Sequence, residues 1–132
     1  MFKRKKEKQN VVFMFNYVCN DTSKCVAFSV NNGAVCADWY DEDGIQHKYE
    51  GVPITDEFWA ALEEVTERCG AFNWKAHKLY AHFAFSLDTS VFNAEAVFPS
   101  GKSFSANNFH GFPDGFEEAI SAYKALFSSI EH

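Results

Sequence analysis

The residues Gly101, Lys102 and Ser103 match the end of the phosphate-binding loop of many nucleotide hydrolases. Such a loop needs a second glycine five residues before the first, and Ala96 occupies that position. It also needs a helix directly after the serine, so that backbone N–H groups and the helix dipole meet the phosphates. The residues that follow Ser103 instead alternate between polar and apolar, as in a strand, and the proline and serine before Gly101 favour a β-turn. We therefore predict the tip of a β-hairpin here and no nucleotide site.

A polar loop at 107–111 is the second place where chemistry could be built, because loops carried by a rigid sheet are where binding sites usually lie. A tryptophan and a histidine in an earlier loop could reach the same place after folding. The candidate binding residues are Trp74, His77, Asn107, Asn108 and His110. The two asparagine side chains could instead only satisfy backbone groups of a turn. A small enzyme with a site near the loop 107–111 is the alternative to a binding site.

The other polar clusters favour no metal site and no catalytic group. Asp41, Glu42 and Asp43 could hold Ca²⁺, but the alternating ligands and closing glutamate of a calcium loop are absent, so we interpret them as a solvated turn. No two histidines have the i, i+4 spacing of a helical zinc site. We expect no catalytic residue, no metal and no cofactor.

The four cysteines lack the CxxC spacing of zinc knuckles and redox sites. Cys36 and Cys69 lie in apolar patterns, which predicts small core residues. Cys19 and Cys25 flank a turn and could face each other across a hairpin. Free thiols are the interpretation we prefer, and a disulfide between these two stays open.

Composition and charge limit the class of protein. The chain has 132 residues, of which 47% are hydrophobic and 17% aromatic, enough to bury the core of one domain. The first eight residues hold five basic side chains and one acid, a charge of +4, and because the whole chain carries −6, residues 9–132 carry −10. We expect residues 1–10 to form a basic, disordered tail and 11–132 a single domain. The acidic body argues against a nucleic-acid partner.

The hydrophobic pattern favours a cytoplasmic, intracellular protein. No apolar run approaches the roughly 18 residues that a membrane span needs. The basic start of the chain is followed by a short, strand-like apolar segment, which differs from a signal peptide or a lipoprotein signal. We therefore expect no membrane span.

Alternating and helical periods predict an α+β fold with an antiparallel sheet. Strands are expected near 11–19, 25–30, 34–40, 45–50, 80–88, 91–98 and 102–107. Two amphipathic helices are expected at 55–69 and 113–130, packed on one face of the sheet. Thr55 can cap the first helix and Gly70 can end it, while Pro113 suits the start of the second. The glutamates at 63, 64 and 67 are expected on the solvent side of the first helix.

Two segments of the chain resemble each other. Each contains a strand, a tight turn, a second strand, a Gly-x-Pro sequence and a helix, in 39–58 and again in 96–116. This similarity indicates either an internal duplication or a shared local solution to the passage from strand to helix.

The loops are rich in aromatic residues, namely Phe72, Trp74, Tyr80, Phe109 and Phe112. We expect them to close the edge of the core; several exposed together would form a surface for a partner or ligand.

Residues 72–130 resemble part of a family of small α+β domains of Gram-positive bacteria. The similarity lies in a tryptophan-containing loop, the aromatic strand HFAFSLDTS, the strand and turn VFPSGKSF, and the start of a helix in GFPDGFEEAI. The turn here is Ser-Gly-Lys where Asp-Gly-Lys is more usual in the family. The resemblance implies the α+β fold and a bacterial source, and it implies no catalytic residues.

The absence of catalytic, metal and nucleotide motifs, together with the aromatic loops, favours a non-catalytic binding or protein-interaction module. Its partner would be a protein or a small ligand. An enzyme should show a deep pocket where polar groups converge, whereas a binding module should show a shallow aromatic surface. An exposed sheet edge could also support a homodimer.

Overall fold

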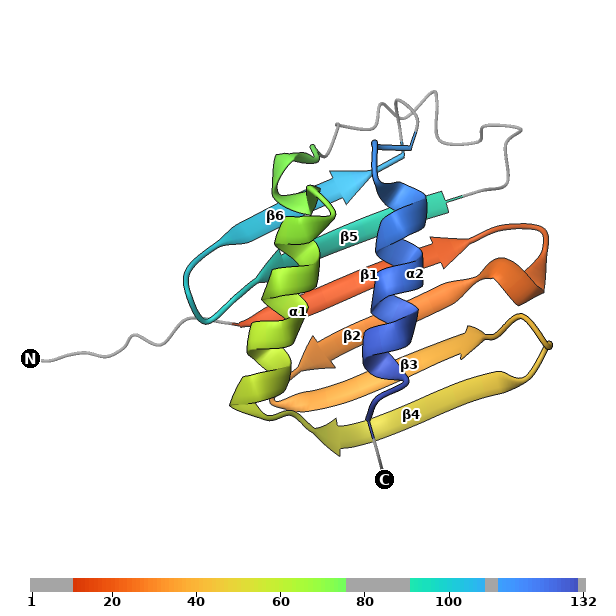
Figure 1. Cartoon of the computed structure of the whole chain (residues 1–132), viewed down its shortest axis with the longest axis horizontal. Coiled ribbons are helices and arrows are strands. Elements are labelled where there is room, and N and C mark those ends of the chain that lie inside the picture. The colour runs from red at the N-terminus through yellow and green to blue at the C-terminus, as the bar shows by residue number, and fades with distance from the viewer. Residues whose placement is uncertain (1–10, 76–90, 109–111, 131–132) are drawn as a thin grey trace, which may run out of the picture.

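The computed structural model describes residues 11–75, 91–108 and 112–130, which form an antiparallel sheet of six strands with helices on one face (Figure 1). The strands are β1 (Val12–Val18), β2 (Val26–Asn31), β3 (Ala34–Tyr40), β4 (Gln46–Pro53), β5 (Val91–Val97) and β6 (Ser103–Asn107). Their order across the sheet is β4-β3-β2-β1-β5-β6, and every neighbouring pair is antiparallel. The predicted α+β fold is therefore confirmed. The expected tail 1–10 and the expected strand 80–88 lie outside the described residues.

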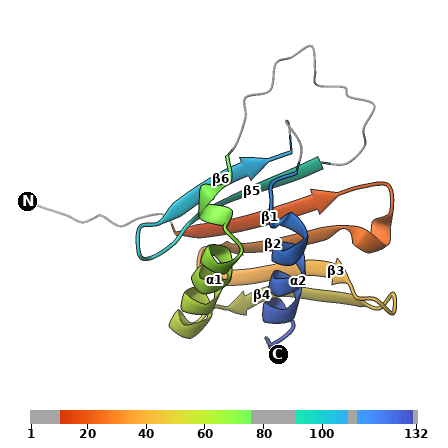
Figure 2. The ribbon, with the colours of Figure 1, turned by 45° about the horizontal axis from the view of Figure 1, so that its top comes forward.

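Two helices, α1 (Asp56–Arg68) and α2 (Phe116–Phe127), lie across the strands. A second viewpoint shows both on the same side of the sheet, as expected from the sequence (Figure 2). Two short 3₁₀ helices, η1 (Thr22–Lys24) and η2 (Ala71–Asn73), follow β1 and α1. No helix in the described ranges is long and apolar enough to cross a membrane.

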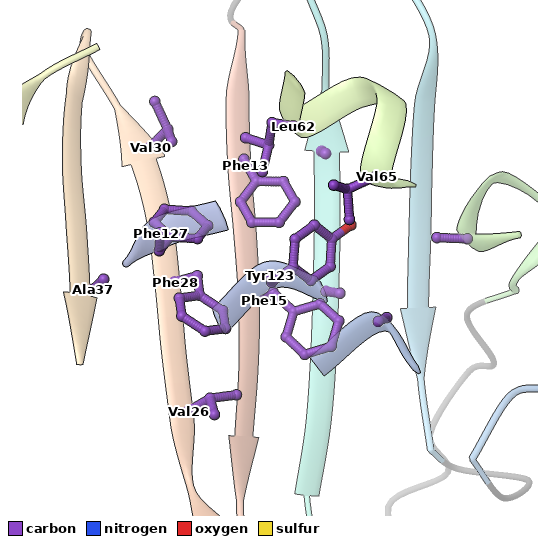
Figure 3. Packing of buried hydrophobic residues seen from close by; sticks show 14 of the residues in the cluster. Phe13, Phe15, Val26, Phe28, Val30, Ala37, Leu62, Val65, Tyr123 and Phe127 are labelled. Carbon is purple, nitrogen blue, oxygen red and sulfur yellow. The ribbon is translucent and has the colours of Figure 1, made fainter. Parts of the chain in front are cut away.

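The core lies between the sheet and the two helices, and it is largely aromatic (Figure 3). Because side chains alternate along a strand, Phe13 and Phe15 of β1 and Phe28 of β2 all point to the helices and are fully buried. They meet Tyr123 and Phe127 of α2, with ring centroids 5.2 Å apart for Phe13 and Tyr123 and 4.6 Å apart for Phe28 and Phe127. Such contacts add to the apolar area that drives folding.

One buried hydrogen-bond pair joins the two helices. The Thr66 hydroxyl donates to the carbonyl oxygen of Leu62 at 2.8 Å, so its oxygen accepts from the Tyr123 hydroxyl at 2.7 Å. Burial raises the pKa of Tyr123, which keeps the phenol protonated and able to donate. This polar contact within the aromatic core joins α1 to α2.

The second helix starts three residues later than predicted. Pro113 and Asp114 suit a helix start, but Gly115 follows with φ = 86°, a left-handed conformation outside any right-handed helix. The N–H of Phe116 donates to the carbonyl of Pro113 at 3.1 Å, so Pro-Asp-Gly forms a turn that leads into α2. The prediction of a helix over 113–130 was wrong at this end for that reason.

The strand boundaries follow the prediction within a few residues, and the largest difference is at β4. This strand continues to Pro53, through a register shift opposite Val35 and Ala37 and a left-handed Gly51 (φ = 68°). Bulges, charged side chains and proline are typical of edge strands that resist pairing with another chain. The outer edge of β4 therefore carries features that disfavour pairing with another strand.

The expected burial of Cys36 was wrong, whereas Cys69 is half-buried and packs against the core. Cys36 lies on β3 between the buried Val35 and Ala37, and it points to the sheet face opposite the helices. No described helix covers that face, so Cys36 is exposed. The apolar neighbours that suggested a core position belong to the other side of the pleated strand.

Candidate functional site

The structure brings two of the five candidate residues together. Trp74, just after η2, and Asn107, the last residue of β6, line one groove near the end of α1 and the start of α2. Asn108 has another role, because its side-chain oxygen accepts from the N–H of Phe92 at 3.1 Å and so caps β5. His77 and His110 lie outside the described residues.

The first wall of the groove forms where α1 ends. Gly70 adopts φ = 81°, which ends the helix as predicted and turns the chain into η2. This reversal places Trp74 against the core, where its ring lies 5.8 Å from Phe92 and 6.0 Å from Phe104. Its indole N–H donates to the carbonyl oxygen of Asp114 at 2.9 Å. Trp74 therefore joins the two walls and is 8% exposed.

The second wall is the segment that leads into α2. Phe112 packs on the rings of Tyr17, Phe92 and Phe116, with centroids 5.7, 6.4 and 4.7 Å away, yet 42% of its surface stays exposed. A Cβ atom added to Gly115 would lie 2.5 Å from the carbonyl oxygen of Cys69. Only glycine therefore allows this segment to approach the end of α1 so closely.

The groove between these walls has a volume of about 590 Å³ and is called here the η2 groove. Its lining residues are Cys69, Gly70, Asn73, Trp74, Lys75, Asn107, Phe112, Pro113, Asp114 and Gly115. Asn73, Lys75 and Asp114 are exposed on the rim, so the groove is open to solvent. Among the described residues of the rim, Lys75 and Asp114 carry opposite charges.

The described lining of the η2 groove combines one thiol with the side-chain amides of Asn73 and Asn107. Cys69 supplies its only thiol among these residues, and burial raises the pKa of that thiol, against a smaller opposite effect of Arg68. A protonated thiol is a poor nucleophile at neutral pH. The amides of Asn73 and Asn107 can donate and accept hydrogen bonds but do not titrate. No group of three or more His, Cys, Asp or Glu side chains among the described residues could hold a metal.

Lys102, from the Gly-Lys-Ser sequence, lines a smaller hollow of about 420 Å³ that shares Gly70 and Asn73 with the η2 groove. Its ammonium is 3.0 Å from a carboxylate oxygen of Glu67 and 5.3 Å from the ring centre of Phe72. Ser100 donates to Glu63 at 2.9 Å. The sequence forms a hairpin tip as predicted, but Glu63 and Glu67 contact that tip instead of facing only solvent.

The acidic turn between β3 and β4 has a structural explanation. One oxygen of Asp41 accepts from the N–H groups of Asp43 and Ile45, at 2.9 and 3.0 Å. The other accepts from Nε2 of His47 at 2.9 Å, and the imidazole stacks on Trp39 with ring centres 5.0 Å apart. The hydrogen bond from His47, then that from Ile45, lower the pKa of Asp41. This carboxylate stabilises its own hairpin.

Comparisons with protein families, curated proteins and solved structures each gave no match to this chain. The similarity of residues 72–130 to small domains of Gram-positive bacteria therefore stays a prediction. Sequence reasoning named Phe112 among the loop aromatics but did not place it beside Trp74 and Asn107. The signal that could have placed it is the Pro-Asp-Gly turn, because this turn directly follows Phe112 and leads the chain into α2.

Proposed function

We propose that the protein is a non-catalytic binding module that takes an extended segment of another protein in the η2 groove. The observation that carries the proposal is the exposure of Phe112 beside the groove. Among the described residues, four large apolar side chains are at least 42% exposed, and Phe112 is the aromatic one of the four. Exposed aromatic rings at the edge of a groove are typical anchor points for a partner.

An extended segment fits this groove better than a small substrate does. Small-molecule sites enclose most of the surface of their ligand, whereas the rim of the η2 groove is formed by exposed side chains. Peptide recognition combines a pocket for a side chain with polar contacts to the peptide backbone. Phe112 and Trp74 would contact an apolar side chain, and the amides of Asn73 and Asn107 would contact backbone groups. Lys75 and Asp114 on the rim would allow charges of either sign.

A displayed library of random peptides, selected on the full-length chain, tests this function. The affinity of the selected peptide is then measured by isothermal titration for the wild type and for Phe112→Ala. We expect the variant to bind about tenfold or more weakly, the effect of losing one aromatic anchor. Ile45→Ala is the matched control, because Ile45 is 58% exposed in the distant β3–β4 turn and should bind the peptide like the wild type.

The indole N–H resonances in a ¹H–¹⁵N NMR spectrum report the place of binding. The resonance of Trp74 should shift on addition of the peptide, while that of Trp59, which packs on Phe98 on the α1 side, should not. Equal affinity of Phe112→Ala and Ile45→Ala for the peptide, or an unchanged Trp74 resonance, would contradict the proposal.

A further inference from the structure

The connection between β1 and β2 holds two cysteines close together, outside the η2 groove. Cys19 follows the last residue of β1 and Cys25 precedes the first residue of β2, with η1 between them. Both side chains are half-buried. The backbone ladder between the two strands ends at the pair Tyr17 and Val26, so the cysteines lie where strand pairing stops.

Beyond the end of the backbone ladder, the thiol of Cys25 makes the contacts to the backbone of Cys19. Its sulfur accepts from the N–H of Cys19 at 3.3 Å and lies 3.5 Å from the carbonyl oxygen of the same residue. Both sulfur atoms approach the carbonyl oxygen of Asp21, at 3.3 Å from Cys19 and 3.8 Å from Cys25. The sum of these two distances limits the separation of the sulfur atoms to about 7 Å. A disulfide brings its sulfur atoms to about 2 Å, so the bond needs the two side chains to rotate toward each other.

The turn itself holds the two thiols in this arrangement. The side chain of Asp21 accepts from the N–H and the hydroxyl of Ser23, at 3.1 and 2.7 Å. The N–H of Lys24 donates to the carbonyl of Asp21, and that of Cys25 donates to the carbonyl of Thr22. The contacts between the thiols and the carbonyl are weak by comparison, because a thiol is a poor donor. A rotation of the cysteine side chains therefore costs little, while the backbone stays fixed.

We propose that Cys19 and Cys25 are a modification site that closes to an intramolecular disulfide on exposure to a small disulfide such as oxidised glutathione. The thiolate of one cysteine attacks a glutathione sulfur, which forms a mixed disulfide and releases one glutathione thiolate. The second cysteine, after losing its proton, attacks the protein sulfur of the mixed disulfide and releases the other glutathione. Two protein thiols are oxidised, one glutathione disulfide is reduced to two thiols, and these carry the two protons.

The position of the other two cysteines makes this pair specific. Cys36 lies opposite Ser29 of β2. Ser29 is four residues after Cys25 along an extended chain, so it lies about 13 Å from Cys25. Cys69 lies at the end of α1 against Gly115. Neither belongs to the turn that brings Cys19 and Cys25 together. Because the second thiol is close, it attacks the mixed disulfide before a stable glutathione adduct can accumulate on either cysteine.

The test uses the full-length chain with Cys36→Ser, because trypsin leaves Cys25 and Cys36 in one peptide, 25–48. The reduced protein is incubated in glutathione redox buffers, quenched in acid, alkylated and digested. Cleavage after Lys24 separates the two cysteines, so a disulfide must appear as peptide 9–24 joined to 25–48. Mass spectrometry should find this joined species lighter by two hydrogens than the two reduced peptides together. Excess reduced glutathione should remove it.

Two further measurements complete the test. In the double variant Cys19→Ser, Cys36→Ser, we expect a stable glutathione adduct on Cys25 in place of the joined peptides. Oxidation of Cys36→Ser should raise its midpoint of thermal unfolding by on the order of 5 °C, because the bond restricts the unfolded chain, and the double variant should show no such rise. Separate glutathione adducts on Cys19 and Cys25 without the joined species, or joining only between different molecules, would overturn the proposal.

Discussion

The two turns that most resembled chemical motifs, residues 41–45 and residues 98–102, have the same backbone structure. In each, the N–H of the first residue donates to the carbonyl of the fifth, at 3.0 and 2.9 Å. The N–H of the fourth residue donates to the carbonyl of the first, at 3.0 and 2.8 Å. That fourth residue is Gly44 in one turn and Gly101 in the other, with φ of 81° and 97°. Both an internal duplication and a shared local solution predict this likeness.

The two turns differ in what stabilises them. In 41–45 the support is local, since Asp41 binds two N–H groups of its own turn and His47 of its own hairpin. In 98–102 one side-chain contact is local, because the N–H of Lys102 donates to the Ser100 hydroxyl oxygen at 3.3 Å. The others come from α1, through Glu63 and Glu67, which precede their partners by 37 and 35 residues. The first turn can form with its hairpin alone, whereas the second is complete only after α1 has docked on the sheet.

The starts of the two helices show the same difference between local and tertiary support. The hydroxyl of Thr55 accepts from the N–H of Phe58 at 3.1 Å, a local cap for α1. No side chain of the described residues caps α2, which starts at the left-handed Gly115 packed on Cys69. The β3–β4–α1 unit is thus stabilised by its own side chains, and the β5–β6–α2 unit by contact with α1.

The largest expected effect comes from Gly115→Ala. Its Cβ would lie 2.5 Å from the carbonyl oxygen of Cys69, and φ = 86° is unfavourable for alanine. We expect a loss of roughly 2 to 5 kcal/mol in the free energy of unfolding, the sum of backbone strain and overpacking. Urea denaturation followed by circular dichroism measures this loss.

Gly70→Ala separates the two causes, because Gly70 has φ = 81° and no atom within 4 Å of its would-be Cβ. It should lose only the backbone part, roughly 1 to 2 kcal/mol. If both variants lose the same free energy, α2 does not depend on its close approach to α1, and the contrast between the two units fails.

Much of the fold was predictable because local patterns reflect local physics. The alternation of β1, the cap at Thr55 and the glycine turns each depend on residues a few positions apart. The Pro-Asp-Gly before α2 misled because the same residues suit a helix start and a turn, and only the approach to Cys69 decides between them. The contacts of Glu63 and Glu67 were not predictable, since the sequence does not say which side of α1 lies over the β5–β6 hairpin.

The candidate site, like the fold, was predictable where it depends on local patterns and not where it depends on tertiary packing. Trp74 and Asn107 come from a loop and a strand end that the sequence placed correctly, and their meeting in the η2 groove follows from the fold. The exposure of Phe112 depends on how tightly it packs between Tyr17 and Phe116, a tertiary property without a sequence signal. Whether these residues bind a partner stays a prediction.

Asp41→Ala tests the local support and should have the second largest effect. It removes the acceptor for two turn N–H groups and for His47, so we expect a lower midpoint of thermal unfolding at neutral pH, by less than for Gly115→Ala. Hydrogen bonding lowers the folded-state pKa of Asp41, so its contribution is complete above the unfolded value of about 3.9 and is lost as pH falls through the folded value. The difference between wild type and variant should therefore shrink below about pH 4. A difference that stays constant with pH would show that the carboxylate charge plays no part.

A smaller effect again is expected for Lys102→Ala, which tests the tertiary support of the turn 98–102. The ion pair with Glu67 is half-exposed on the lysine side and more so on the glutamate side, and exposed pairs contribute little. We expect a small decrease in the thermal midpoint that becomes smaller still in high salt, where the attraction is screened. Glu67→Ala should cost less than Lys102→Ala, because it leaves the ammonium over the ring of Phe72.

A double-mutant cycle of Lys102→Ala and Glu67→Ala decides whether the turn depends on α1. A coupling free energy between the two positions that decreases with salt shows that α1 supports the turn through this pair. Strictly additive effects would mean that this ion pair adds nothing to the turn, which would leave the hydrogen bond from Ser100 to Glu63 as its side-chain contact with α1. The ion pair would then not distinguish the turn 98–102 from the turn 41–45, whose side-chain support is local.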